Sequence, residues 1–225
     1  MPRLSKRSRA NLALKPDGPQ PIHEAVKALK KFRGPGFNQT VEVCVHLGID
    51  NRQADQKLRG SIALPKGVGK SARVVCFCPD DKVEAAKAAG AVEAGGEDLA
   101  EKIEGGWFEF DVAVASPDMM KVVGKLGRVL GPKGLMPSPK AGTVTPDVET
   151  AVKEYAAGKL EYRSDDGGNV HLVLGKMDFP DSDLVENFQY FMDTIYRIRP
   201  SAAKGTYVKK CVISATMTPG VPVAV

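Results

Sequence analysis

The sequence predicts an α+β / α/β protein in which an inserted Rossmann-like α/β domain interrupts a discontinuous α+β domain made from both chain ends. Strand and helix patterns alternate through the middle of the chain, as in a parallel α/β unit. The first and last thirds instead combine amphipathic helices with strands whose polar and apolar residues alternate. These patterns divide the chain into residues 1–66 plus 159–225 and residues 67–158. They leave open whether the two end pieces pair.

Composition indicates a soluble globular protein with an uneven charge distribution. The 225 residues are 43% apolar, which is enough for a core, and no apolar run approaches the ~20 residues that span a bilayer. The start, MPRLSKRSRANLALKPDG, lacks the apolar core of a signal peptide, so we expect a cytosolic protein without a membrane partner. Basic residues exceed acidic ones by eight in residues 1–66, whereas residues 67–158 carry a net charge of −3. Such asymmetry suggests a phosphate-bearing partner, although a solvated basic face is the commoner cause.

Neither the cysteines nor the histidines predict a metal site, and no cofactor is expected. Cys76 and Cys78 are separated by one residue within a strand-like run, whereas paired zinc ligands usually have about two to four residues between them. Cys44 and Cys211 are distant in sequence, so we expect four reduced, buried thiols. The histidines lie in separate amphipathic segments, which favours satisfied or exposed side chains over catalytic ones: they are His23, His46 and His171.

The N-terminal segment predicts an arm that is ordered only where it packs or binds, followed by a basic helix. Prolines and glycines within residues 12–21 exclude regular structure there. Residues 22–33 carry apolar side chains at helical spacing and lysines elsewhere, so they predict an amphipathic helix with a basic side. Lys30 and Lys31 lie near its end, and a Gly-Pro-Gly sequence stops it.

Residues 40–46 predict a half-buried strand, because valines alternate with polar residues, among them Thr40 and Glu42. A turn-rich segment then leads to GVGKS, which contains part of a phosphate-binding loop. That motif needs a glycine five residues before Gly69, where Leu64 stands, and a helix after it, whereas a strand follows. We therefore interpret this Gly/Pro-rich segment as the first crossing between two domains.

The middle of the chain predicts strands that alternate with helices. The strands are expected at 72–78, 91–94 and 110–116, and the helices at 80–90, 97–106, 117–127 and 145–159. No GxGxxG sequence follows the first strand, and no acidic residue is placed to bind a ribose. The order of elements is therefore Rossmann-like without a dinucleotide site.

The segment from Gly127 to Thr145, GRVLGPKGLMPSPKAGTVT, predicts a shaped cationic loop. It contains Arg128, Lys133 and Lys140 but no acid. Proline removes backbone donors and glycine raises backbone entropy, so an ordinary helix or central strand is not expected here. Two interpretations stay open: an RNA-facing or hinge-facing role, and a structural role in which the glycines and prolines fix the path of the chain.

The last third begins with two predicted strands and a long helix. Residues 159–163 and 169–174 flank SDDGG, and we expect them to pair as a hairpin. Residues 182–199 keep apolar side chains at helical spacing, and Pro200 marks the end of this helix.

The final alternating segment, 207–217, predicts another strand. Lys210, Ser214 and Thr216 share its polar face. Hydroxyl donors on a rigid sheet face suit contacts with the ribose and phosphate groups of RNA. The last nine residues, 217–225, are expected to be irregular.

Several of these segments together resemble the ribosomal protein L1 family, and specifically its bacterial type. The resemblance is carried, in chain order, by GIDNRQADQKLRGSIALPKGVGK, FDVAVASPDMMKVVGKLGRVLGPKGLMPSPKAGTVTPDV, YRSDDGGNVHLVLGK and AAKGTYVKKCVISATM. It implies that the two chain ends pair into one RNA-binding domain and that the inserted domain packs loosely across a hinge.

The resemblance also implies a function. It indicates a cytoplasmic, non-enzymatic constituent of the large ribosomal subunit, monomeric within the ribosome, that binds the mobile stalk of large-subunit rRNA near the tRNA exit site and assists tRNA release. Bacterial members bind a mimic of that rRNA in their own messenger, so repression of translation of the own operon mRNA is implied as well. The alternatives are a free translational repressor and an α/β enzyme whose basic loop holds a phosphorylated substrate. The enzyme interpretation lacks a clustered nucleophile, base and acid.

Individual RNA-contacting residues follow from the same resemblance. Phe37 and Thr40 match positions where the family's end domain touches RNA, and Thr216 with Met217 matches the start of its Thr-Met-Gly motif. For Phe37 a core position is the alternative. The full expected set is Lys30, Lys31, Phe37, Thr40, Glu42, His171, Lys204, Lys210, Ser214, Thr216 and Met217.

The chain departs from the family pattern at two positions. Thr218 stands where glycine is usual, and Gly36 stands where many relatives carry a lysine. Glycine permits close backbone approach to RNA and a positive φ, both of which threonine disfavours. The missing lysine shifts the expected phosphate contacts to Lys30, Lys31 and Lys210.

Overall fold

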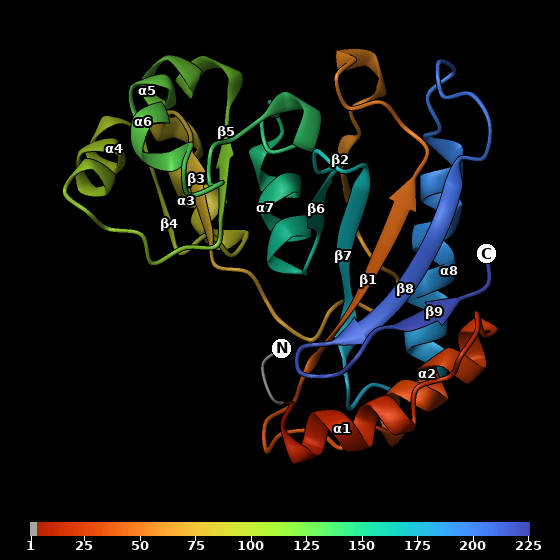
Figure 1. The fold of residues 1–225 in the computed structure, drawn as a ribbon. Helices are drawn as coiled ribbons and strands as arrows, with labels where there is room; N and C mark the ends of the chain where they lie inside the picture. The colour runs from red at the N-terminus through yellow and green to blue at the C-terminus, as the bar shows by residue number, and fades with distance from the viewer. Residues whose placement is uncertain (1–3) are drawn as a thin grey trace. The chain divides into compact units, whose positions relative to one another are not determined.

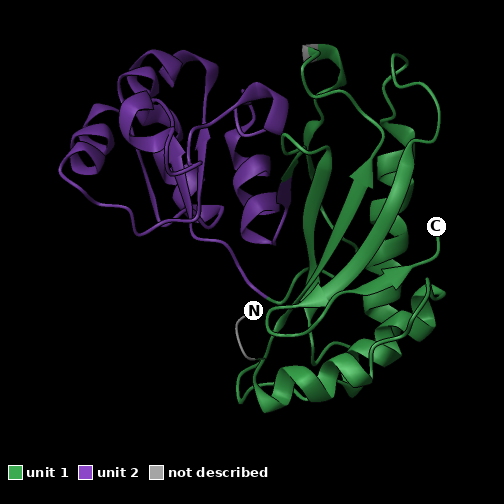
Figure 2. Ribbon diagram, in the orientation of Figure 1, with its two compact units in different colours: residues 1–69, 162–225 green, residues 70–161 purple. Residues whose placement is uncertain are grey.

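The computed structural model describes residues 4–225 as a mixed α/β protein (Figure 1). The chain forms two compact units, the first from Met1–Gly69 with Tyr162–Val225 and the second from Lys70–Glu161 (Figure 2). Each unit contains its own sheet and its own buried apolar side chains. The polypeptide therefore enters the second unit once and leaves it once.

A four-stranded sheet in the order β7-β1-β8-β9 forms the centre of the first unit. The strands are β1 (Thr40–Leu47), β7 (Asn169–Lys176), β8 (Val208–Ala215) and β9 (Val221–Val223), and each neighbouring pair is antiparallel. The helices α2 (Ile22–Lys31) and α8 (Asp181–Arg197) pack against this sheet. The valines of β1 are fully buried, as its alternating sequence predicts.

The N-terminal arm is ordered where it packs, as expected, but Lys6–Ala13 form the helix α1, which the sequence did not predict. The Ser5 side chain caps this helix by accepting a hydrogen bond from the Ser8 N–H at 3.1 Å. The buried Asn11 side chain donates to the Arg33 carbonyl at 3.1 Å and accepts from the Arg33 N–H at 2.9 Å. This tertiary anchor stabilises a short helix that its own sequence would leave marginal.

The C-terminal residues contain the edge strand β9, so the expectation of an irregular end is wrong there. Val221 and Val223 are buried on either side of Pro222. Pro222 has no N–H to donate, but its carbonyl accepts from the Gln20 N–H at 3.0 Å. An edge strand tolerates proline. Because prolines otherwise argue against a strand, sequence rules do not predict one in this segment.

The hairpin expected around SDDGG does not form as a pair of strands. β6 (Leu160–Arg163) pairs with β2 (Arg59–Ile62) in a two-stranded sheet, whereas β7 pairs with β1. An isolated antiparallel bridge between Ser164 and Val170 joins the two segments. Both strands exist where the sequence predicts them, but pairing with distant strands replaces the local pairing.

The second unit contains a three-stranded parallel sheet in the order β4-β3-β5. Its strands are β3 (Val74–Phe77), β4 (Glu93–Gly95) and β5 (Val112–Ala115), and its helices are α3 (Val83–Ala88), α4 (Glu97–Glu104), α5 (Met120–Lys125), α6 (Gly127–Leu130) and α7 (Val148–Ala156). The 3₁₀ turns are η1 (Ala54–Gln56) in the first unit and η2 (Asp80–Lys82), η3 (Pro117–Met119) and η4 (Pro139–Ala141) in the second. The predicted alternation of strands and helices is confirmed.

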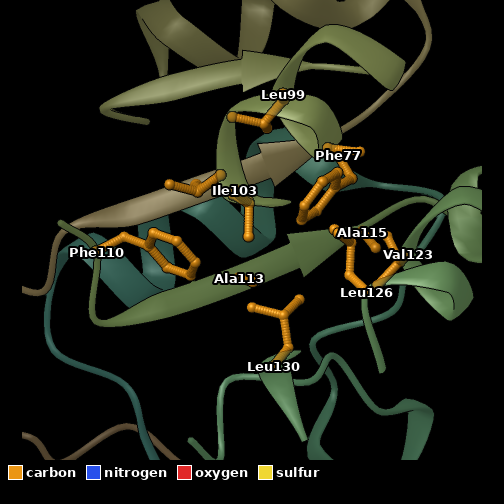
Figure 3. Close-up of a cluster of buried hydrophobic side chains, with 11 residues drawn as sticks. Phe77, Leu99, Ile103, Phe110, Ala113, Ala115, Val123, Leu126 and Leu130 are labelled. Atoms are coloured by element: carbon orange, nitrogen blue, oxygen red, sulfur yellow. The ribbon is translucent and has the colours of Figure 1, made fainter. Parts of the chain in front are cut away.

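Apolar side chains cover both faces of this parallel sheet. Val75 and Phe77 of β3 belong to one buried cluster, part of which Figure 3 shows together with Ile103 of α4. Val74 and Cys76 point to a second cluster on the other face. A sheet buried on both faces explains why its strands read as continuous apolar runs.

The segment Gly127–Thr145 is more structured than the expected loop. Its first four residues form α6, and the fully buried Leu130 belongs to the cluster in Figure 3. Farther along, the Tyr155 hydroxyl donates to the Ala141 carbonyl at 2.7 Å, and Val144 forms a parallel bridge with Ala115 of β5. The segment contains no long helix or strand, as predicted, but its backbone is anchored at several points.

Candidate nucleic-acid interface

The side of the first unit's sheet that faces away from its buried valines carries polar side chains. On β1, Glu42 is exposed and Thr40, Cys44 and His46 are half-buried. At about 3.3 Å per residue, the six steps from Thr40 to His46 make this polar face roughly 20 Å long. Glu42 lies opposite Ser214 in the register between β1 and β8. The alternation predicted for residues 40–46 is therefore confirmed.

At one end of the polar face, hydrogen bonds join three chain segments into a fixed corner, which we call the Thr40 corner. The Thr40 N–H donates to Thr216 Oγ1 at 3.2 Å, and the Thr216 N–H donates to the Thr40 carbonyl at 3.2 Å. Lys176 Nζ donates to Thr40 Oγ1 at 2.8 Å. The Met217 N–H donates to Gln39 Oε1 at 2.9 Å. Two hydroxyls and one ammonium group are thereby held at fixed positions.

Two large apolar side chains adjoin this corner in sequence and are exposed. Phe37 is 54% exposed and Met217 is 49% exposed. Phe37 is thus not a core residue, and the alternative interpretation for it is wrong. An exposed aromatic ring can stack on a base, which contributes roughly 1–3 kcal/mol in single-stranded nucleic-acid complexes.

The centre of the polar face contains a cysteine and a histidine in contact. Cys44 Sγ lies 3.9 Å from His171 Nε2, which lies 3.8 Å from Asp165 Oδ2. Hydrogen bonds from the Asn169 side chain and then from its backbone N–H hold the pKa of Asp165 below its usual value. Burial, followed by the negative charge of Asp165, raises the pKa of the Cys44 thiol. Cys44 is therefore a neutral thiol at neutral pH.

Positive charge lies at the two ends of the polar face rather than at its centre. Lys176 belongs to the Thr40 corner. Lys210 is exposed at the opposite end, where it pairs in register with His46, and the His46 ring bonds to Asn169 Oδ1 at 2.9 Å. A polyanion lying along this face would meet a cation near each end.

Three of the lysines expected to contact RNA lie away from this face. Lys30 Nζ donates to the Phe179 carbonyl at 2.5 Å and pairs with Asp181 at 2.6 Å, so it links α2 to the start of α8. Lys31 is exposed at the end of α2. Lys204 is exposed in the loop before β8.

Sequence reasoning missed Lys176. Alternation along β7 predicts His171 on the polar face, but the register shifts between Val41 and Glu42, which changes the alternation beyond that point. Gly175 has a φ of 153°, and a Cβ there would lie 2.9 Å from Phe179. A glycine inside an alternating strand is the signal for such an irregularity.

The two departures from the family pattern fit the structure without strain. A Cβ on Gly36 would have no neighbour within 4 Å. The Thr218 hydroxyl accepts from the Ala215 N–H at 3.0 Å, and the Thr218 N–H donates to the Ala215 carbonyl at 3.0 Å. Thr218 therefore closes the turn after β8, and within residues 4–225 only glycines have a positive φ.

In the second unit, the basic side chains of the Gly127–Thr145 segment are exposed. Lys133 Nζ lies 4.1 Å from the centre of the Phe108 ring, a cation–π contact, and Arg128 and Lys140 are also exposed. The anchored backbone agrees with the structural interpretation of this segment. Its exposed cations remain available to a polyanion.

Three further observations concern metal-binding groups, membrane spans and cysteines. Over residues 4–225, no three His, Cys, Asp or Glu side chains are grouped as a metal ion would require. Along the same stretch, no helix combines the length and the apolar character needed to cross a bilayer. All four cysteines are free; Cys76, Cys78 and Cys211 are buried as expected, whereas Cys44 is half-buried because it lies on the polar face.

Fixed hydroxyls, an exposed aromatic ring and lysines at both ends of a sheet face are features of an RNA-binding module on an α/β scaffold. A comparison with known families agrees: the sequence model of the ribosomal protein L1p/L10e family matches residues 29–219, which is most of the chain. The chain belongs to that family. Its members are structural, non-enzymatic proteins of the large ribosomal subunit that bind ribosomal RNA.

Proposed function

We propose that this protein is a cytoplasmic, structural constituent of the large ribosomal subunit that binds the mobile stalk of large-subunit rRNA as a monomer. The polar face of the first unit is the proposed RNA site. The observation that carries the proposal is the Thr40 corner, where Thr216 and Lys176 supply hydroxyl and ammonium groups, with the exposed Phe37 three residues before Thr40 in sequence. No catalytic step is assigned to the protein.

Each group at this site suits a different part of RNA. The hydroxyls of Thr40, Thr216 and Ser214 contact ribose 2′-hydroxyls and phosphate oxygens, and Glu42 accepts hydrogen bonds from ribose or from base amino groups. Phe37 stacks on a base that is not paired. The lysines at the two ends of the face neutralise phosphates and make the affinity depend on salt.

The division of the chain into two compact units supports separate binding roles for two domains. We infer that residues 1–66 plus 159–225 form the rRNA-binding domain and that residues 67–158 form an inserted domain that meets tRNA in the exit site and assists its release. The second unit has its own core on both faces of its sheet, as an independent domain needs. Arg128, Lys133 and Lys140 supply its exposed cations.

The same polar face is the proposed site for the protein's own operon mRNA. An mRNA segment that mimics the folded stalk rRNA would present the same ribose and phosphate pattern to the same hydroxyls. Because one site cannot hold both RNAs, free protein that exceeds the available rRNA would bind the messenger and repress its translation.

Salt-dependent binding tests the proposal directly. Wild-type protein is titrated with the stalk segment of large-subunit rRNA and with a scrambled hairpin of equal length, at several salt concentrations. We expect a clear preference for the stalk segment and affinity that falls with salt. Thr216→Val should weaken the specific complex about fivefold, the equivalent of one net hydrogen bond of roughly 1 kcal/mol.

Thr216→Ser is the matched variant, because it keeps the hydroxyl that accepts from the Thr40 N–H. It should bind like wild type. Equal, weak binding of wild type to both RNAs would contradict the proposal, and so would identical affinities for Thr216→Val and Thr216→Ser.

A further inference from the structure

An open cleft of about 600 Å³ lies at the end of the first unit's sheet. Its walls come from the segment after β1, from the turn around η1 and from the loop that leads into β8. Gly48 directly follows β1, and Lys209 directly precedes Lys210 in β8. The cleft therefore adjoins the Lys210 end of the polar face.

Close packing fixes the walls on either side of Gly48. The Gly48 N–H donates to the Tyr207 carbonyl at 2.7 Å, and a Cβ at this position would collide with the Thr206 carbonyl oxygen. Arg199 stabilises the same loop, because its guanidinium donates to the Ala203 and Gly205 carbonyls at 3.1 Å each. These contacts form the wall without any ligand.

The remaining wall is a hydrogen-bonded turn. The Asp50 N–H donates to Gln56 Oε1 at 2.8 Å, and Gln56 Nε2 donates to Gln53 Oε1 at 2.9 Å. Asp50 Oδ1 in turn accepts from the Arg52 N–H at 3.0 Å. The acidic side chain of this wall is thus already engaged with the backbone.

Positive charge in the cleft lacks a partner. Lys204 and Lys209 both line it and are exposed, and neither ammonium group forms an ion pair or hydrogen bond with any residue from 4 to 225. Asp50 is the single acid among the residues that line it. Two unpaired ammonium groups at the edge of a pre-formed cleft suit an anion.

We propose that this cleft binds a backbone phosphate of RNA, so that RNA held on the polar face continues around the end of the sheet into it. The proposal rests on the proposed function and extends its binding site. Lys209 and Lys210 are consecutive in β8, and both are exposed. The register between β1 and β8 shifts here, because His46 lies opposite Lys210 and Leu47 opposite Val208, so Lys209 is an extra residue without a partner on β1. An RNA strand that passes this end of the sheet meets both.

An RNA phosphate fits this cleft better than a free anion does. Two exposed lysines give little affinity for an isolated ion, which water solvates well. When RNA is already bound to the polar face, its neighbouring phosphate is present near the cleft at a high effective concentration. A weak attraction to the two lysines is then enough for that phosphate to bind.

The test compares two double variants that each remove two exposed lysines from the first unit. Lys204→Ala/Lys209→Ala removes the cleft charges, and Lys15→Ala/Lys27→Ala removes one charge from the segment after α1 and one from α2. We expect the cleft variant to lose roughly one to two units of salt slope and to bind the stalk segment about tenfold more weakly near 0.1 M salt. The control should change neither quantity, and thermal melting should show both variants folded.

A second measurement identifies the source of the anion. The stalk RNA should protect the Lys209 amine from acylation, whereas inorganic phosphate alone at about 1 mM should not, given its weak attraction to exposed lysines. Protection by inorganic phosphate as strong as that by RNA would overturn the assignment to RNA. If wild type still prefers the stalk segment, equal salt slopes for the two double variants would overturn the proposed phosphate site in the cleft but not the proposed function. Loss of that preference would overturn the proposed function itself.

Discussion

Lys176 and Thr40 are joined side chain to side chain, with Lys176 Nζ donating to Thr40 Oγ1 at 2.8 Å. Thr40 in turn is bonded through its backbone to Thr216 at the end of the neighbouring strand. The ammonium group is therefore held on the Thr40 hydroxyl, and Thr40 itself is fixed by segments from both ends of the chain. A positive charge that is fixed in place loses less side-chain entropy when a phosphate binds, which favours Lys176 over a freely moving surface lysine.

Lys176→Met tests the role of this charge, because methionine keeps an apolar stem of similar length. We expect the salt slope for the stalk rRNA to fall by about one unit and the affinity to weaken several-fold. The measurement is the salt titration described above. Lys27→Met, on the exposed side of α2, is the control and should leave the slope unchanged. Equal slopes for the two variants would remove Lys176 from the site.

Sequence reasoning predicted most elements and the polar face, because both follow from local periodicity. Thr40 and Glu42 alternate with valines that are buried, and no distant information is needed to see it. It missed what depends on distant partners. The helix α1 is stabilised by the contact between Asn11 and Arg33, and β9 by pairing with β8, neither of which leaves a periodic signal.

The same limit explains the missed lysine at the candidate site. A register shift between Val41 and Glu42 and the irregular backbone at Gly175 bring Lys176 to the corner, and alternation alone cannot show either. Lys30 illustrates the converse case. Its position on a basic helix suggests a phosphate contact, whereas the structure pairs it with Asp181.

Gly36→Lys should increase RNA affinity. A Cβ at this position would meet no atom within 4 Å, so lysine fits without rearrangement and adds a cation close in sequence to Phe37 and Thr40. We expect the affinity for the stalk rRNA to rise about threefold to tenfold and the salt slope to grow by about one unit. Gly18→Lys adds the same charge in similarly open space near the N-terminus and serves as the control. An equal gain in both variants would show a general charge effect instead of a contact at the site.

Cys44 should be the first cysteine to react with an alkylating reagent. It is half-buried, whereas Cys76, Cys78 and Cys211 are buried, and burial raises the pKa of Cys211 to about 12. The pKa of Cys44 is also raised, so its thiolate fraction is small at neutral pH. The labelling rate should therefore still increase with pH at values above the pKa of an ordinary thiol. Mass spectrometry of the labelled peptides measures the order.

Bound RNA provides the second part of this test. Cys44 lies in the centre of the polar face, in contact with His171. The stalk rRNA should therefore slow its labelling several-fold, while the scrambled hairpin should not. Unchanged labelling in a saturated complex would mean that RNA binds elsewhere on the protein.

Asn187→Ala should destabilise the first unit strongly. This fully buried side chain of α8 accepts from the Lys66 N–H at 3.1 Å and donates to the Gly67 and Leu174 carbonyls at 3.0 and 2.8 Å. Alanine leaves these backbone groups without their partner, and we expect the free energy of unfolding to fall by about 2–4 kcal/mol. Urea unfolding measures the change, with Gln189→Ala on the exposed side of α8 as the control. A loss below about 0.5 kcal/mol, the usual range of surface substitutions, would show that water replaces the amide and that Asn187 does not tie residues 66–67 to this unit.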